Sequence, residues 1–265
     1  MRPLAVVGNL SRDLVDGSPP RAGGAPFHAA RALRVLGRPA LVGAKCAHSD
    51  RDSLLTPLVR LGLPVLWRGG SSTAAFSFRY EGDRRVMVVE ALGDPWGPAD
   101  LYGLERADWV HVGALARSDF PAKTLAELAR DRRVSFDGLG LVRPERTGPL
   151  ELDAAYDPEV LRHVSILKLA EEEARTLVGE PDESALRSLG VPEVVVTLGS
   201  EGSLVLADGK LEQVPAQAAG EVDPTGAGDA FSAVYLASRS SGHAPVAAAR
   251  RATALVAGLL ARRIP

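Results

Sequence analysis

Short apolar runs alternate with longer amphipathic runs along this chain. The apolar runs predict strands at 4–7, 40–42, 109–112, 134–136, 165–167, 194–198 and 204–206. Because these runs are continuously apolar, we expect strands that are buried on both faces. The amphipathic runs predict helices at 26–36, 53–61, 122–130, 171–178, 183–189, 228–239 and 245–261. Strand-then-helix alternation favours one α/β domain over 1–265, with a mostly parallel central sheet covered by helices.

One region interrupts this alternation. Between 65 and 90 the chain has three β-like runs and no helical pattern, and the runs 73–80 and 85–89 flank the turn sequence Glu81-Gly82-Asp83. This pattern predicts an antiparallel β-hairpin. We expect 65–90, with part of 11–20, to form a small inserted β lid over the sheet edge where ligands bind. A hairpin that merely decorates the edge of the sheet is the alternative.

Composition narrows the classes of function. The chain has 265 residues and a formal net charge of −2, which indicates neither nucleic-acid binding nor a membrane surface. A single cysteine, Cys46, excludes an intrachain disulfide and a thiolate metal cluster and indicates a reducing, cytoplasmic location. The apolar run at the N-terminus is too short for a signal peptide.

Several catalytic motifs are absent from the sequence. It contains no G-x-x-x-x-G-K-[ST], no G-x-G-x-x-G after the first strand, no H-E-x-x-H and no G-x-S-x-G. These absences argue against a P-loop NTPase, a dinucleotide-binding fold, a zinc enzyme and an α/β-hydrolase.

Candidate chemistry is concentrated in the segment Asp223-Pro224-Thr225-Gly226-Ala227-Gly228-Asp229-Ala230-Phe231. Gly226 and Gly228 leave the N–H groups of a helix N-terminus accessible to a phosphate. Asp229, in the first helical turn, is placed to accept a proton from an attacking hydroxyl. Because a helix N-terminus stabilises an ionised carboxylate, we expect Asp229 to be a weak base, which a loose phosphoryl-transfer transition state tolerates. A glycine-rich loop before a helix-stabilising aspartate is the alternative.

The whole string closely resembles the C-terminal signature D-x-x-G-A-G-D-x-F of the ribokinase-like (PfkB) carbohydrate kinase family. The resemblance implies a ribokinase-like three-layer α/β/α sandwich with a small β lid, ATP as the phosphoryl donor and Mg²⁺ as its companion ion. It implies that Asp229 is the catalytic base and that the backbone of Gly226, Ala227 and Gly228 forms the anion hole. Asp223 and Thr225 match positions that hold a monovalent cation, such as K⁺, in some relatives.

Three further features resemble the substrate side of the family. The segment Val6-Val7-Gly8-Asn9-Leu10-Ser11-Arg12-Asp13 resembles the first strand, which implies that Asp13 accepts hydrogen bonds from substrate hydroxyls; a turn aspartate is the alternative. The pair Gly23-Gly24 resembles the motif where substrate approaches the backbone, and His28 stands where the family often has asparagine. Asp137, after the strand 134–136, resembles a substrate residue of some sugar and polyol members.

Two segments resemble the nucleotide side of the family. The segment Thr197-Leu198-Gly199-Ser200-Glu201-Gly202 resembles the T-x-G-x-x-G turn that contacts ATP, which assigns Thr197, Gly199 and Gly202 to ATP binding. The segment Lys168-Leu169-Ala170-Glu171-Glu172-Glu173 resembles the N-x-x-E segment whose glutamate holds Mg²⁺ through water. Glu173 takes that position, and Lys168 is assigned to ATP. Since Ala170 replaces the asparagine, we expect weaker organisation of Mg·ATP.

These resemblances predict an ATP-dependent kinase that phosphorylates a hydroxyl of a small sugar, sugar acid or polyol. This small-molecule substrate is the expected binding partner. A nucleoside kinase of the same fold is an alternative, because Phe76, Phe78 and Tyr80 are suited to stack a base. A catalytically silent small-molecule-binding protein is a second alternative, motivated by Ala170 and the short length. An exposed apolar face on Ala75, Phe76 and Phe78 would favour a homodimer through the lid.

Overall fold

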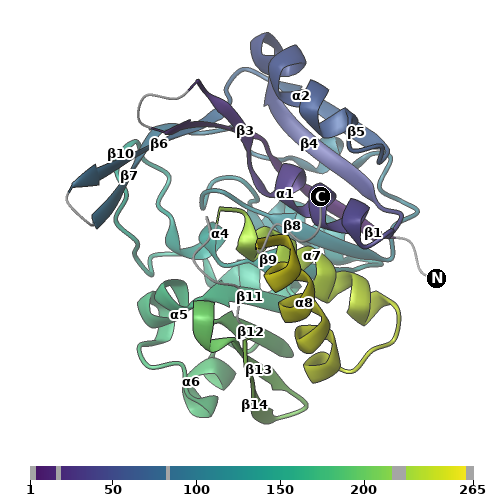
Figure 1. The fold of residues 1–265 in the computed structure, drawn as a ribbon, viewed down its shortest axis with the longest axis vertical. Coiled ribbons are helices and arrows are strands. Elements are labelled where there is room, and N and C mark those ends of the chain that lie inside the picture. The colour runs from purple at the N-terminus through teal and green to yellow at the C-terminus, as the bar shows by residue number, and fades with distance from the viewer. Residues whose placement is uncertain (1–3, 16–18, 82–83, 217–224, 261–265) are drawn as a thin grey trace.

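The computed structural model describes residues 4–15, 19–81, 84–216 and 225–260 (Figure 1). Within these ranges a nine-stranded sheet has the order β14-β13-β12-β11-β9-β8-β1-β4-β5. The members that pair in parallel are β1 (Leu4–Asn9), β4 (Leu41–Ala47), β5 (Val65–Gly70), β8 (Trp109–Gly113), β9 (Arg133–Asp137), β11 (Ile166–Ala170) and β12 (Glu193–Thr197). The antiparallel edge consists of β13 (Ser203–Ala207) and β14 (Lys210–Val214).

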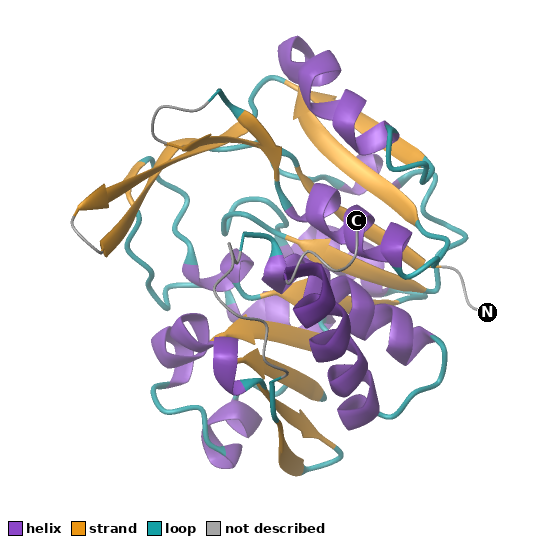
Figure 2. Cartoon of the chain, viewed as in Figure 1, coloured by secondary structure: helices purple, strands orange, loops and turns teal. Residues whose placement is uncertain are grey.

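Helices cover both faces of this sheet, which confirms the predicted three-layer α/β/α sandwich (Figure 2). One face carries α1 (Ala25–Val35), α2 (Arg51–Val59), α7 (Ala227–Ser240) and α8 (Pro245–Leu260). The other carries α3 (Ala122–Ala129), α4 (Leu139–Val142), α5 (Glu171–Val178) and α6 (Glu183–Ser188). Successive side chains of a strand point to opposite faces of the sheet. In β1, Val6 packs in the core formed with α1, α7 and α8, and Val7 packs in the core formed with α3.

The strands are buried as their continuous apolar runs predict. Every residue of β1 and of β8 is buried, since helices cover the sheet on both sides. Among the described connections, four are short 3₁₀ helices: η1 (His48–Asp50), η2 (Pro98–Leu101), η3 (Pro158–His163) and η4 (Gly199–Glu201). Over the described part of the chain, none of the helices combines the length and the apolarity that crossing a membrane requires.

A second, smaller sheet stands beside the carboxyl edge of the main sheet (Figure 1). Its order is β10-β7-β6-β2-β3, formed by β10 (Gly148–Pro149), β7 (Arg84–Ala91), β6 (Ala74–Glu81), β2 (Ser11–Val15) and β3 (Arg21–Gly23). The predicted hairpin is present, because β6 and β7 pair antiparallel, with Phe76 opposite Val89. Gly82 and Asp83 of its predicted turn lie outside the described residues.

One expectation about the inserted segment is wrong. Residues 65–70 do not belong to the small sheet, because β5 pairs in parallel with β4 and completes a strand–helix–strand unit of the main sheet. The small sheet instead recruits β3 and β10. An exposed apolar face on Ala75, Phe76 and Phe78 would have favoured a homodimer, but these side chains are only 3%, 4% and 8% exposed within the single chain. The homodimer stays a prediction.

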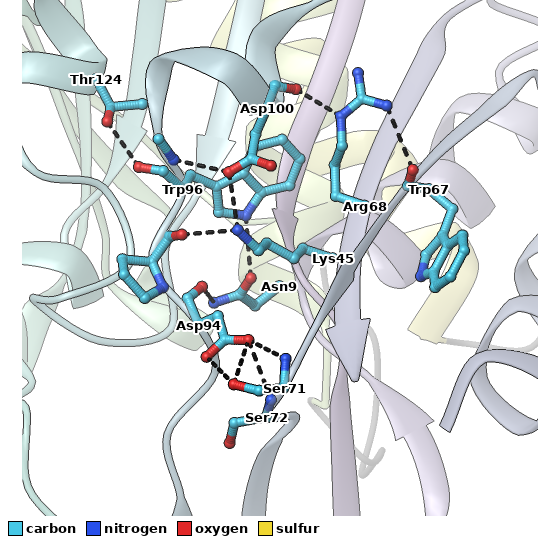
Figure 3. Close-up of polar contacts among 12 residues, drawn as sticks. Asn9, Lys45, Trp67, Arg68, Ser71, Ser72, Asp94, Trp96, Asp100 and Thr124 are labelled. Atoms are coloured by element: carbon cyan, nitrogen blue, oxygen red, sulfur yellow. Dashed lines mark hydrogen bonds and ion pairs between the residues drawn. The ribbon is translucent and has the colours of Figure 1, made fainter. Parts of the chain in front are cut away.

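Polar contacts fix the base of the hairpin to the main sheet (Figure 3). The Asp94 carboxylate, after β7, accepts a hydrogen bond from the N–H of Ser72 at 3.1 Å, before β6. Asn9, at the end of β1, donates its Nδ2 to the Asp94 carbonyl at 3.2 Å. Lys45 of β4 donates its Nζ to the carbonyl of Pro95 at 2.8 Å. The two strands of the hairpin are thereby joined to each other and to β1 and β4.

Candidate active site

A buried ion pair lies where β9 and β11 approach their carboxyl ends. Asp137 is the last residue of β9 and is in register with Lys168 of β11. The Lys168 Nζ lies 3.3 Å from Asp137 Oδ2, while Asp137 Oδ1 accepts the N–H of Leu139 at 3.1 Å. Both side chains are buried. The main sheet therefore places a paired cation and carboxylate at the edge where α/β folds bind ligands.

The first turn of α7 meets this pair. Gly226 is the N-cap of α7 and has φ 78°, in the left-handed region that glycine adopts without strain. A Cβ at Gly226 would lie 2.3 Å from His28 Nδ1, and a Cβ at Gly228 would lie 3.0 Å from Lys168 Nζ. His28 of α1 and Lys168 of β11 therefore flank the glycines. Because the first N–H groups of a helix have no intrahelical partner, this end of α7 is suited to bind an anion.

Asp229 lies in that same first turn and is half-buried. Burial raises the pKa of its carboxyl to about 7, and the negative charges of Asp137 and Asp13 act in the same direction, whereas Lys168 and Arg143 oppose the shift. The expectation of a weak base is therefore wrong, because desolvation and two neighbouring carboxylates outweigh the helix N-terminus. A carboxylate with this pKa is suited to accept a proton near neutral pH.

Glu173 approaches the site from α5. Its Oε2 accepts the N–H of Ala170 at 2.8 Å, and its side chain is buried. Burial raises the pKa of Glu173 to about 7, against the opposing charge of Lys168. Burial opposes the charge on Lys168, but Asp137, Glu173 and Asp229 outweigh it and raise the pKa of Lys168 above its ordinary value. Lys168 therefore remains a cation among three carboxylates.

The proposed substrate residues lie at the junction of the two sheets. Asp13 in β2 accepts a hydrogen bond from Ser11 Oγ at 2.8 Å. A Cβ at Gly23 would lie 2.2 Å from Asp13 Oδ2, so that position has no space for a side chain. Gly24, the N-cap of α1, has φ 91°, and a Cβ there would lie 2.4 Å from the carbonyl oxygen of Asn9. The glycine pair thus permits close approach of backbone and carboxylate.

The residues assigned to ATP at β12 lie farther along the same edge. Thr197, the last residue of β12, is in register with Ala170 and donates its Oγ1 to the Leu169 carbonyl at 3.3 Å. Gly199 and Gly202 frame η4 with φ 57° and 103°. This turn lies two strands from β9, so its residues belong to a neighbouring part of the edge.

Of the two positions assigned to a monovalent cation, one lies within the described residues. Thr225 is exposed and directly precedes Gly226. Asp223 lies outside the described residues.

Two residues near the site were not predicted from the sequence. Arg143 follows α4 and is buried, with its guanidinium carbon 4.7 Å from the centre of the Phe76 ring. Asp119 lies in the loop after β8 and accepts the N–H of Leu115 at 2.8 Å. Burial raises the pKa of Asp119 to about 6. Asp119 lies in no recognisable sequence motif. For Arg143, the sequence signal was its position six residues after Asp137, a candidate site residue.

The carboxylates match the preference of Mg²⁺ for oxygen ligands, and Asp137 and Glu173 lie beside Lys168. No group of three or more histidine, cysteine, aspartate or glutamate side chains in the described ranges is arranged to hold a metal ion by itself. The residues therefore fit an ion that takes most of its ligands from phosphate oxygens and water, as Mg²⁺ does in kinases.

Comparisons with known sequences identify a family whose model matches most of the chain. A sequence model described as pfkB family carbohydrate kinase matches residues 20–262. A ribokinase of Bacillus subtilis (strain 168) is 29% identical over 163 residues, which cover 61% of this chain and 53% of that protein. A fructokinase of Salmonella thompson is 30% identical over 188 residues, which cover 66% of this chain and 79% of that protein. The matched segment thus spans about half of the ribokinase.

Solved structures match over nearly the whole chain. A pyrophosphate-dependent kinase in the ribokinase family, complexed with a pyrophosphate analog and myo-inositol, has a TM-score of 0.85 at 25% identity, covering 99% of this chain and 96% of that chain. The ribokinase of Arabidopsis thaliana, complexed with ribose and ATP, has a TM-score of 0.75 at 21% identity, covering 100% and 96%. The second likeness shows the fold alone.

Proposed function

Because the chain belongs to the pfkB family of carbohydrate kinases, we propose that it transfers the γ-phosphoryl group of ATP to a hydroxyl of a small sugar, sugar acid or polyol. One observation carries this proposal. Asp229, with a pKa raised by burial to about 7, lies in the first turn of α7 beside the glycine N-terminus and Lys168. Base, anion hole and cation are the parts that phosphoryl transfer requires.

On the acceptor side, Asp13 and Asp137 accept hydrogen bonds from substrate hydroxyls, and the Gly23-Gly24 backbone lets the substrate approach. His28 contacts both α7 and the acceptor. The attacking hydroxyl oxygen forms a bond to the γ-phosphorus, the bond from that phosphorus to the bridging oxygen breaks, and ADP leaves. Asp229 takes the hydroxyl proton, for which a pKa near neutrality is well matched.

On the donor side, the N–H groups of Gly226, Ala227 and Gly228 and the ammonium of Lys168 receive the charge of the transferred phosphoryl group. The turn of Thr197, Gly199 and Gly202 holds the rest of ATP. Glu173 would hold Mg²⁺ through water, and the ion would supply positive charge to the donor phosphates. K⁺ would be held at Asp223 and Thr225.

The small sheet acts as a lid in this proposal. It lies beside the carboxyl edge of the main sheet (Figure 1). Its strand β2 carries Asp13. Its closure over a bound acceptor would exclude water and limit hydrolysis of the donor.

Cys46 is buried and unpaired in disulfides, which supports a reducing, cytoplasmic location.

Pyrophosphate is a second candidate donor. It is favoured by the likeness to a pyrophosphate-dependent kinase at a TM-score of 0.85. The groups around Gly226 and Lys168 are suited to bind phosphate and do not contact a nucleobase in this proposal. They therefore accommodate either ATP or pyrophosphate as the donor.

The test is a screen of purified protein with Mg²⁺ and either ATP or pyrophosphate against sugars, sugar acids, polyols and nucleosides, with phosphorylated product detected by mass spectrometry. Asp229→Asn is expected to lower turnover by roughly 10²–10⁴ while donor binding persists. Unchanged turnover in Asp229→Asn would remove the assigned base. Phosphorylation of nucleosides alone would favour a nucleoside kinase, and binding without turnover would favour a silent binding protein.

A further inference from the structure

Arg143 is a buried cation that the proposed chemistry does not use. Its exposed fraction is 5%, and its Nε has no hydrogen-bond partner among the described residues. Its guanidinium carbon lies 4.7 Å from the centre of the Phe76 ring, which belongs to β6 of the small sheet. Because a buried guanidinium is costly without compensation, its surroundings must stabilise the charge.

Carboxylates from the active site supply part of that compensation. Burial lowers the pKa of Arg143, and the negative charges of Glu173, Asp137, Asp119 and Asp13 act to raise it. Arginine remains charged under such conditions. One guanidinium is therefore attracted by carboxylates on β2, β9 and α5 while it contacts an aromatic ring of β6.

The path of the chain places Arg143 where the main body joins the small sheet. The segment after Arg143 reaches the small sheet as β10, and the N–H of Leu150 donates to the Met87 carbonyl at 2.9 Å. The segment then returns, and the N–H of Asp153 donates to the Val142 carbonyl at 3.0 Å. Residues 143–152 thus form a loop that is closed at its base and joined to β7 near its tip.

We propose that Arg143 is a positioning residue that couples the small sheet to the acceptor-binding carboxylates. Its contact with Phe76 seats β6 beside Asp13 and Asp137, while its charge holds those carboxylates in place. The kinetic consequence rests on the proposed kinase function, whereas the structural consequence does not. Without this contact the small sheet separates more readily, which weakens acceptor binding and admits water to the donor.

The experiment compares Arg143→Met, Phe76→Leu and the double variant with the wild-type chain. Arg133→Met is the control for loss of an arginine–aromatic contact away from the carboxyl edge. Arg133 is exposed at the start of β9, and its guanidinium carbon lies 5.0 Å from the centre of the ring of Trp109, which begins β8. Steady-state rates are measured for the acceptor and for the donor. Hydrolysis of the donor without acceptor is measured separately.

In each single variant we expect the KM of the acceptor to rise about 10-fold or more, while the KM of the donor changes less than about 2-fold. The ratio of donor hydrolysis to phosphoryl transfer should rise in the same variants. Because Arg143 and Phe76 act through one contact, the double variant should lose much less than the sum of the two single effects. Additive losses, or an equal rise of both KM values, would overturn the proposal.

Hydrogen exchange of the backbone amides of β6 and β7 provides a test that requires no activity. Exchange should accelerate in Arg143→Met and in Phe76→Leu and remain unchanged in Arg133→Met. If the wild-type chain phosphorylates nothing, the proposed function fails while this measurement still decides the inference. If Arg143→Met does not fold, Phe76→Leu decides it, and unchanged exchange in that variant overturns the coupling.

Discussion

Lowering the pH from 8 to 5 is expected to slow turnover about 100-fold, because the catalytic base becomes protonated. The pKa of Asp229 is about 7, against an ordinary value of 3.8, and burial is the main cause. The ionised form that accepts the proton therefore falls to about one tenth at pH 6 and about one hundredth at pH 5. A carboxylate with its ordinary pKa would remain more than about nine tenths ionised at pH 5.

A second variant tests the cause of this shift. The charge of Asp137 contributes to the raised pKa of Asp229, after burial. Asp137→Asn removes that repulsion and also frees Lys168 from its partner at 3.3 Å, and both changes favour ionised Asp229. The acidic limb of the pH profile should therefore move to lower pH in Asp137→Asn, even though acceptor binding becomes weaker.

The assay measures initial rates of product formation from pH 5 to about 9 at constant ionic strength, with donor and acceptor saturating. Glu173 also has a pKa near 7, so Glu173→Gln serves as the control that removes its titration. The fall of the turnover rate at acid pH should persist in Glu173→Gln. A flat profile between pH 7 and 5, or a limb that disappears in Glu173→Gln, would refute the assignment of the titration to Asp229.

Two further predictions concern α7. Glu193 binds the Arg239 guanidinium with Oε2 to Nη2 at 2.8 Å, so Glu193→Gln should lower the free energy of unfolding by roughly 3 kcal/mol in urea denaturation. Glu171→Gln, at an exposed pair, should cost less than about 1 kcal/mol, and equal losses would contradict this reading. Gly226→Ala should lower turnover at least about 10-fold, because its positive φ and close packing at the anion site exclude a Cβ. Gly37→Ala, at φ 65° with open space, should reduce stability without reducing turnover, and loss of turnover in both variants would point to a general backbone effect.

The central architecture could be predicted from the sequence because its signals are local. Continuous apolar runs flanked by amphipathic ones indicate buried parallel strands and covering helices. The segment around Gly226 and Asp229 combines glycines, a helix start and a carboxylate within a few residues. The structure places Gly226 beside His28 and Gly228 beside Lys168.

The remaining features depend on contacts between distant segments. β5 resembles the hairpin strands in composition, yet it pairs with β4 because α2 returns the chain to the main sheet. β10 has two residues, too few for a periodic signal. The pKa of Asp229 depends on Asp13 and Asp137, which lie more than ninety positions away along the chain, so local sequence indicated the opposite direction.

The composite origin of the small sheet has a consequence for how the chain folds. Its strands span 11–15, 21–23, 74–81, 84–91 and 148–149, and β2 pairs with β6 across a long intervening segment that contains the β4–α2–β5 unit. Such pairings have high contact order and carry the entropy cost of loop closure before they gain stability. We therefore expect refolding in two kinetic steps, in which the main sheet forms first and the small sheet docks last. A protease that is added early in refolding should cut preferentially within 74–91, before these strands gain their partners.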